Sequence, residues 1–256
     1  MQVSHKLKNK LLRLNAVPLL GKVLYFKEDK PLPDPEFWRE TVYQGQQGRL
    51  TLRLLGLPLL RLHHSTSLED VYAQRRNPHL ERSLPEMIEK RLIPPLDGRS
   101  RVLESGCNAG GFLRYLADCY GCEIHGLDIS AEAIEYARST MFADYPRATF
   151  YCQDVLEHQF FNRFPADYFS HTFCLSHLVH VPNGPAKQAY IKQLKRISRC
   201  VIFFERMPRE DNPEKETRHT EDYAAEYNFT LYRKHPKMDR SKWMGIFYWT
   251  PEMNSM

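Results

Sequence analysis

The sequence predicts an α/β fold in which a doubly wound, mostly parallel sheet of seven strands carries helices on both faces. From about residue 100 onward, short apolar segments alternate with segments of helical periodicity. A glycine-rich turn, "SGCNAGG", follows the first apolar segment, and no convincing helix separates the last two. The alternation predicts parallel strands, and the final pair predicts an antiparallel closure of one edge.

The expected strands follow one another in the order RVLE, EIHGLD, ATFYC, YFSHTFC, CVIFFE, FTLYR and GIFYW. A helix with an apolar face of Phe112, Leu113, Leu116 and Ala117 follows the first strand. Ser130 is the expected N-cap of the next helix, and Pro185 the expected first turn of a third. This third helix buries its face of Tyr190, Ile191, Leu194 and Ile197.

The first 84 residues have a different character, so the chain is predicted to divide into an N-terminal extension, residues 1–84, and a main domain, residues 85–256. The extension is expected to cover the site. Alternating leucines in "GRLTLRLLGLPLLRLHH" predict a hairpin with one buried face. Two helices are expected to begin after Ser67 and Ser83, and the second to stop at Pro94.

Charge and composition limit the classes of protein. The 256 residues are 42% apolar, which suits a packed core, and no run of 18 apolar residues or secretory signal is present, so a cytoplasmic location is expected. Residues 1–30 hold seven cations and two acids, a balance of 7 − 2 = +5 that equals the whole net charge. This arm suits peripheral contact with an anionic membrane or phosphates, but a solvated docking helix is the favoured interpretation.

The six cysteines are scattered, as in proteins that keep reduced thiols. Cys119 and Cys122 have the spacing of a zinc or redox pair, but no second pair accompanies them, and two ordinary thiols are the favoured interpretation. No metal site is predicted.

Three acids stand at the ends of expected strands: Glu104, Asp128 and Asp154. In such a sheet, ligands bind beyond the carboxyl ends of the strands. Asp128 lies 22 residues after Gly106, a spacing at which an acid reaches ribose hydroxyls. Glu104 would repel the pyrophosphate of a dinucleotide, so the acids favour a cationic ligand with a ribose and an adenine. S-adenosylmethionine combines these features.

Four segments, "VLESGCNAGGFLRYLA", "IHGLDISAEAIEYAR", "FYCQDVLEH" and "FCLSHLVHVP", resemble successive blocks of class I S-adenosylmethionine-dependent methyltransferases, which have Rossmann-like folds. The resemblance covers about residues 84–250 and departs from the usual pattern in having Asn108 at the middle glycine. It implies that the methionine end is lined by Glu104, Gly106, Asn108, Gly110 and Leu175. It also implies that Asp128 and Ile129 hold the ribose and adenine, and that Asp154 and Val155 contact the adenine edge.

A hydroxyl acceptor must lose a proton during methyl transfer, and a positioned imidazole can remove it near neutral pH. "LSHLVHVP" offers His177 and His180 as candidate bases. His180 aligns with a family histidine that is either catalytic or orders the loop, whereas His171 lies within a strand and is expected to be a satisfied core histidine.

The favoured function is methylation, O-directed, of a small molecule or glycan, because the hairpin is similar to a pattern in some bacterial enzymes that build surface polysaccharides. A nucleic-acid (RNA) methyltransferase is the first alternative, motivated by the sequence pI of about 8.8. Against it, the main domain has no basic excess and no Asn/Asp-Pro-Pro-aromatic signature. A catalytically silent cofactor-binding module is the second alternative. The charged stretch from Arg206 to Asp222 is a candidate flap beside the site.

Overall fold

The computed structural model describes residues 77–207, 221–236 and 243–254, together with the strand backbones 2–4, 24–29, 48–54 and 57–65. The chain forms two compact units, Met1–Gln74 and Arg75–Met256. This division falls before the predicted boundary at residue 84. The expectation that the N-terminal extension covers the site stays a prediction.

The first unit contains a four-stranded sheet in the order β1-β4-β3-β2. Its antiparallel hairpin consists of β3 (Gly48–Leu54) and β4 (Leu57–Ser65), so the hairpin predicted from the alternating leucines is confirmed. β2 (Leu24–Asp29) pairs antiparallel with β3, and β1 (Gln2–Ser4) pairs parallel with β4. The predicted buried face, the helix after Ser67 and the basic side chains of residues 1–30 lie outside what the structure describes.

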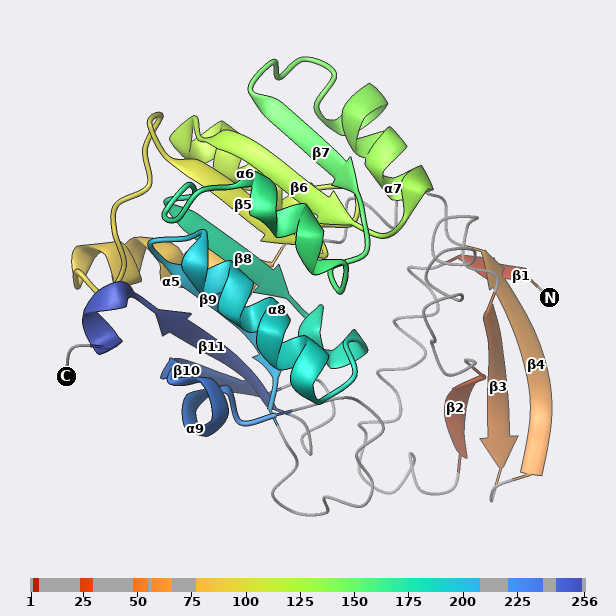
Figure 1. The fold of residues 1–256 in the computed structure, drawn as a ribbon. Helices are drawn as coiled ribbons and strands as arrows, with labels where there is room; N and C mark the ends of the chain where they lie inside the picture. Colours follow the sequence, from red (N-terminus) through yellow and green to blue (C-terminus); the bar gives the residue numbers. More distant parts are fainter. Residues whose placement is uncertain are drawn as a thin grey trace. The chain divides into compact units, whose positions relative to one another are not determined.

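The second unit contains the predicted seven-stranded sheet, in the order β10-β11-β9-β8-β5-β6-β7 (Figure 1). Its strands in chain order are β5 (Arg101–Ser105), β6 (Glu123–Asp128), β7 (Ala148–Cys152), β8 (His171–Leu175), β9 (Val201–Arg206), β10 (Thr230–Pro236) and β11 (Trp243–Trp249). β5 to β9 are parallel, whereas β11 runs antiparallel to both β9 and β10. The antiparallel pair therefore closes one edge as predicted, and the reversed strand is β11, one position in from that edge.

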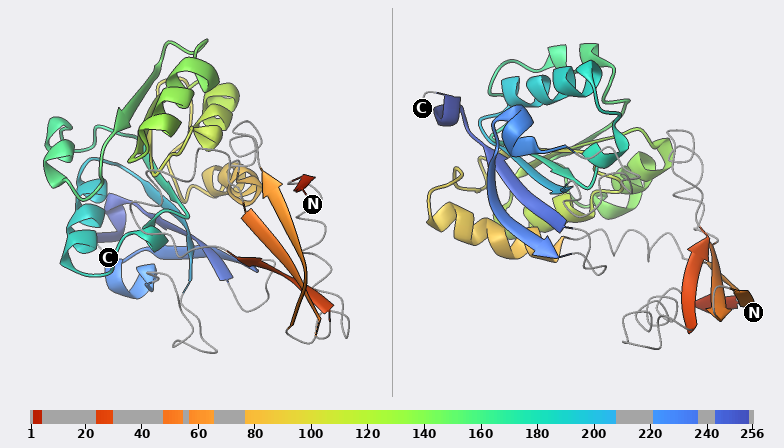
Figure 2. Two further views of the ribbon diagram at one scale, coloured as in Figure 1. Left: turned by 90° about the vertical axis from the view of Figure 1, so that its right-hand side faces the viewer. Right: turned by 90° about the horizontal axis from the view of Figure 1, so that it is seen from below.

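Helices cover both faces of this sheet, as the right-hand view of Figure 2 shows for α5 and α8. One face packs against α5 (Pro78–Glu89), α6 (Gly111–Tyr120) and α7 (Ala131–Tyr136), which the π-helical turn η2 (Ala137–Met141) extends. The other face packs against η3 (His158–Arg163), α8 (Pro185–Arg196) and α9 (Tyr223–Tyr227). No helix among the described residues is long and apolar enough to span a bilayer.

The predicted start of α5 at Ser83 is wrong. Asn77 caps this helix, because its Oδ1 accepts a hydrogen bond from the N–H of Leu80 at 3.0 Å, and Pro78 occupies the first turn. Ser83 is instead buried within the helix. Since Leu84 and other α5 side chains enter the core of the second unit, residues 77–84 belong to that unit.

The predicted stop of α5 at Pro94 is also wrong, because the helix ends at Glu89 with Lys90 as its C-cap, and Arg91 has a left-handed φ of 56°. The predicted starts of α7 and α8 are confirmed. Ser130 accepts a hydrogen bond from the N–H of Ala133 at the start of α7, and Pro185 begins α8. The predicted apolar faces of α6 and α8 are buried. α9 and the short η4 (Leu178–His180) were not predicted, since each is too short to show a helical period. Most of the candidate flap lies outside the described residues.

Candidate functional site

The turn between β5 and α6 has a backbone that suits close approach by a ligand. Gly106, Asn108 and Gly110 have φ values of 76°, 54° and 79°, a left-handed conformation that glycine and asparagine tolerate best. The amide of Gly106 donates to the carbonyl of Leu127 at 2.7 Å, so the turn is attached to the end of β6. Asn108 therefore performs the backbone role that the sequence pattern assigns to a glycine.

Asp128 joins the glycine turn to the next helix. Its Oδ2 accepts a hydrogen bond from the N–H of Asn108 at 2.8 Å, and its Oδ1 accepts one from the N–H of Ser130 at 3.0 Å. Carboxylate oxygens accept hydrogen bonds from hydroxyls as well as from amides, which is the chemistry that recognition of ribose hydroxyls needs. Asp128 is half-buried at the end of β6.

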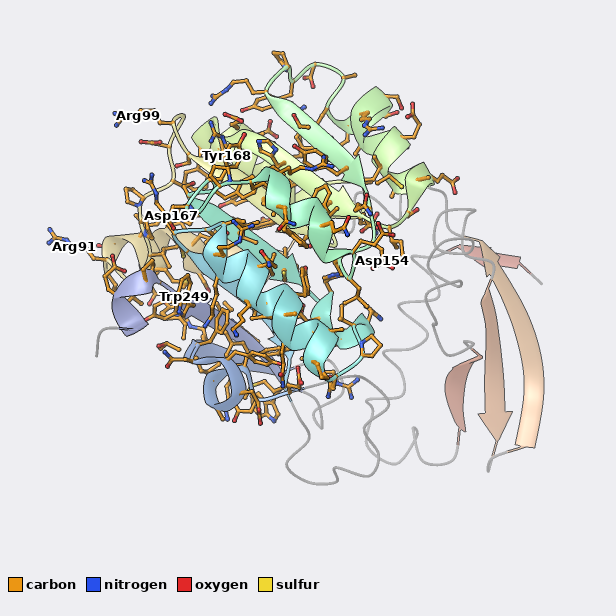
Figure 3. All side chains as sticks on the ribbon, viewed as in Figure 1. Arg91, Arg99, Asp154, Asp167, Tyr168 and Trp249 are labelled. Carbon is orange, nitrogen blue, oxygen red and sulfur yellow. The ribbon has the colours of Figure 1, made fainter. Side chains whose placement is uncertain are left out.

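The other two strand-end acids lie on the neighbouring strands. β5 pairs with β6, and β6 pairs with β7, so Glu104, Asp128 and Asp154 follow one another along the carboxyl edge. Figure 3 shows Asp154 at this edge and Asp167 with Tyr168 at the opposite one. Asp154 is half-buried, and its Oδ1 accepts a hydrogen bond from the N–H of Leu156 at 2.9 Å.

The acids make the turn electronegative. Burial, followed by the charges of Asp128 and Glu104, raises the pKa of the Cys107 thiol well above its usual value. Cys107 is fully enclosed in the turn and stays a thiol. A cationic ligand end, such as an ammonium or a sulfonium, suits this environment better than a phosphate does.

Two of the three predicted apolar residues directly follow strand-end acids, and the third ends β8. Ile129 and Leu175 are half-buried and Val155 is buried. Ile129 and Val155 each come directly after an acid, at the ends of adjacent strands, while Leu175 ends β8, which pairs with β5 on its other side. The structure thus gathers the predicted cofactor residues along one edge, and their contacts with a cofactor stay a prediction.

Packing alone explains why position 110 is a glycine. It precedes α6 in the N-cap position, and a Cβ atom there would lie 2.8 Å from the ring of Phe142. Its absent side chain therefore lets helix and core pack closely, whether or not its backbone also borders a ligand.

The loop after β8 brings His177 to the glycine turn. The His177 ring lies so close to Gly106 that a Cβ atom on Gly106 would be 2.3 Å from its Cγ. Its Nε2 is buried without a hydrogen-bond partner among the described residues, and burial lowers the pKa of His177 to about 4. His177 is therefore neutral at physiological pH. His180 ends the same short turn, and its N–H donates to the carbonyl of His177 at 2.9 Å.

Two sequence predictions concern residues outside the site, namely His171 and the pair Cys119 and Cys122. His171 is a satisfied core histidine, as predicted: it is fully buried, and its Nε2 lies 3.0 Å from the carbonyl oxygen of Pro94. Cys119 is exposed whereas Cys122 is buried, and burial raises the pKa of Cys122 to about 12. Cys122 is therefore an unreactive thiol.

The sequence interpretation missed Glu205. This acid lies near the end of β9, and its Oε1 accepts hydrogen bonds from the N–H groups of His177 and Leu178. The signal was available, because Glu205 ends the predicted strand CVIFFE as the other acids end theirs.

An α/β domain with this strand order, a glycine turn and acids at three neighbouring strand ends belongs to the class of nucleoside-binding folds. Residues 102–200 match the model of the family described as "Methyltransferase domain". This segment is a methyltransferase domain of the class I S-adenosylmethionine-dependent family.

Comparisons with known proteins agree with this assignment. Over 66 residues the chain is 39% identical to malonyl-[acyl-carrier protein] O-methyltransferase of Enterobacter lignolyticus (strain SCF1), a match that covers 26% of this chain and 25% of that protein. The chain thus spans about a quarter of the curated relative that it matches.

Two solved structures share the fold. The bifunctional kinase-methyltransferase WbdD has a TM-score of 0.53 and 16% identity, over 69% of this chain and 40% of that one. Geranyl diphosphate C-methyltransferase from Streptomyces coelicolor A3(2) has a TM-score of 0.51 and 9% identity, over 66% of this chain and 79% of that one. At these identities the likeness concerns the fold.

Proposed function

We propose that this chain is an S-adenosylmethionine-dependent methyltransferase that methylates an oxygen atom of a small molecule or glycan. The observation that carries the proposal is the Asp128 carboxylate at the end of β6, which accepts hydrogen bonds from the N–H of Asn108 in the glycine turn and from the N–H of Ser130. The neighbouring acids make the turn electronegative, which complements the positive charge of the cofactor's methionine end.

The cofactor supplies an electrophilic methyl group on a sulfonium, and the protein must orient it and exclude water. In this proposal Asp128 and Ile129 hold the ribose and adenine, and Asp154 with Val155 contact the adenine edge. Glu104, Gly106, Asn108, Gly110 and Leu175 border the methionine end.

His177 is the proposed base for a hydroxyl acceptor. Burial keeps its imidazole neutral, so the ring is able to accept a proton at physiological pH. Its pKa of about 4 makes it a weak base in this structure, so the proposed role requires that pKa to rise toward the operating pH when acceptor and cofactor bind. His180, three residues along the same loop, is the alternative base.

The choice of acceptor is supported by the nature of the similar proteins. The curated relative is an O-methyltransferase, and WbdD, which shares the fold, is a bifunctional kinase-methyltransferase. We place the acceptor outside the nucleic-acid class because the main domain has no basic excess. The basic arm of residues 1–30 is proposed to hold the otherwise cytoplasmic protein at an anionic membrane surface.

Calorimetry with S-adenosylmethionine tests the cofactor. Asp128→Ala should weaken binding by at least about tenfold, because it removes charged hydrogen-bond acceptors from the site. Asp97→Ala is the matched control. Like Asp128, Asp97 accepts a hydrogen bond from the N–H two residues further on, that of Arg99 at 2.8 Å, but it lies before β5, at the opposite edge of the sheet. Equal affinity in both variants would contradict the proposal.

The acceptor class is tested separately with a methyl-labelled cofactor. Label transferred to sugar or small-molecule fractions supports the proposal, and label transferred to RNA would replace it with the nucleic-acid alternative. If the cofactor binds but no fraction is labelled and no S-adenosylhomocysteine forms, the chain is a binding module. RNA binding would also weaken steeply with salt in a gel shift.

A further inference from the structure

Glu205 is a buried acid that the mechanism above does not use. It is completely inaccessible to solvent on β9, on the face of the sheet covered by α8 and α9. Burial raises the pKa of its carboxyl to about 7, although the backbone hydrogen bonds oppose this rise. An acid in such a place costs folding stability when it ionises, so its contacts need an explanation.

The contacts of Glu205 lead to the loop that carries the candidate bases. Its Oε1 lies 2.7 Å from the amide nitrogen of His177 and 2.8 Å from that of Leu178. These are the first N–H groups of the short turn η4, which has no side-chain cap of its own. A carboxylate from the neighbouring strand therefore takes the place of an N-cap residue.

The same loop meets the cofactor turn on its other side. The His177 ring is in contact with Gly106 and stands edge-on to the ring of Tyr190, at a centroid distance of 6.2 Å. The hydroxyl of Tyr190 donates to Oγ of Ser105, the last residue of β5, at 2.6 Å. A chain of direct contacts thus connects Glu205, the His177 backbone, the His177 ring and the glycine turn.

Other titratable groups surround Glu205. Lys187 and Tyr190 face it from α8, Tyr223 from α9 and Cys174 from β8. Lys187 is also fully buried and forms an ion pair with Glu221 at 3.0 Å. Burial raises the pKa of Tyr190, Tyr223 and Cys174 well above their usual values, so these three groups stay neutral while Glu205 titrates.

We propose that Glu205 is a positioning residue of the methyl-transfer site: its buried carboxylate holds the loop of His177 and Leu178 against the glycine turn. The part of this inference that concerns cofactor binding rests on the proposed function. The ionised carboxylate forms the stronger hydrogen bonds with the two amides. Protonation of Glu205 should therefore loosen the loop near neutral pH.

Amide NMR of the full chain, without any ligand, tests this directly. The amide protons of His177 and Leu178 should shift together with a midpoint near pH 7, which matches the raised pKa of Glu205. The shift should be absent in Glu205→Gln, which keeps an acceptor oxygen and a similar volume but does not titrate. Amides that do not respond between pH 6 and 8 (roughly one unit on each side of the expected midpoint), or that still titrate in Glu205→Gln, would overturn the proposal.

Hydrogen exchange and calorimetry measure the positioning effect. Glu205→Ala should raise amide exchange in the His177 loop and weaken S-adenosylmethionine binding, each about tenfold, whereas Glu205→Gln should rescue most of both losses. The control is Thr172→Val, which removes the buried Thr172–Ser198 hydrogen bond of 2.7 Å in the neighbouring strand. It should lower stability without altering either readout.

Equal effects of Glu205→Ala and Thr172→Val on loop exchange and on affinity would show general destabilisation and overturn the proposal. If the wild-type chain binds no S-adenosylmethionine, the proposed function fails, but the amide titration still decides whether Glu205 holds the loop. The two failures are therefore distinguishable.

Discussion

Gly106→Ala tests whether the contact between the glycine turn and His177 is as close as the structure shows. The new Cβ atom would lie 2.3 Å from both Cγ and Nδ1 of His177, and 2.7 Å from its Cβ. Gly106 also has a φ of 76°, which an alanine adopts at a cost of about 1–2 kcal/mol. Overpacking adds about 1–3 kcal/mol, so we expect a total destabilisation of about 2–5 kcal/mol.

Gly121→Ala separates the two contributions. Gly121 has a similar φ of 67°, but its nearest neighbour to a built Cβ atom is Cα of Gly98 at 3.7 Å, an ordinary contact. We therefore expect only the backbone cost of about 1–2 kcal/mol. The difference between the two variants, about 1–3 kcal/mol, measures the crowding at His177.

Urea unfolding of both variants and of the double variant Gly106→Ala/His177→Ala provides the assay. Removing the ring opens the space that the new methyl group needs, so the double variant should be more stable than the sum of its single changes predicts, by about 1–3 kcal/mol. Equal destabilisation at Gly106 and Gly121, with additive effects in the double variant, would refute the proposed contact.

Three further predictions concern buried or capping groups. The folded-state pKa of Glu205 is raised, so its stabilising contribution is present below about pH 4.5 and is lost as the pH rises through about 7. In urea titrations between pH 4.5 and 8.5, the unfolding free energy of the wild type should therefore fall by about 3 kcal/mol relative to that of Glu205→Gln. A constant difference between the two proteins would contradict this prediction. The lowered pKa of His177 means that its imidazole NMR shift should stay constant from about pH 8 down to about pH 5 and change only near pH 4, whereas a midpoint near 6.5 would show an accessible ring. Asn77→Ala should lower the free energy of unfolding by about 1 kcal/mol in thermal unfolding, because it removes the N-cap of α5. Ser83→Ala should be nearly neutral, because the buried Ser83 hydroxyl has no hydrogen-bond partner among the described residues. The reverse order of the two effects would restore the predicted helix start at Ser83.

The local patterns of the sequence predicted most of the second unit. Its seven strands and the helices α5, α6, α7 and α8 have the expected order, since apolar periodicity and capping residues act over a few neighbouring positions. The error at Ser83 arose because Asn77 followed by Pro78 is also an N-terminal signal, and the sequence offered two starts for one helix. The strands β1 and β2 were missed because they are short or strongly charged.

The sequence by itself determined the elements of the candidate cofactor site. Glu104, Asp128 and Asp154 each end a strand, and parallel strands bring their ends to one edge, so a local pattern was enough to predict that these acids gather there. The left-handed turn followed in the same way from its glycines and Asn108.

Only the tertiary structure decided how the loop after β8 is held. The bond from the N–H of His177 to Glu205 spans 28 positions in the sequence, and the contact of the His177 ring with Gly106 joins two further elements. No periodicity records such contacts, because they depend on which strands become neighbours and on which side chains face each other once the core has packed. The glycine turn is therefore a local property of this chain, and the position of His177 over it is a property of the folded sheet.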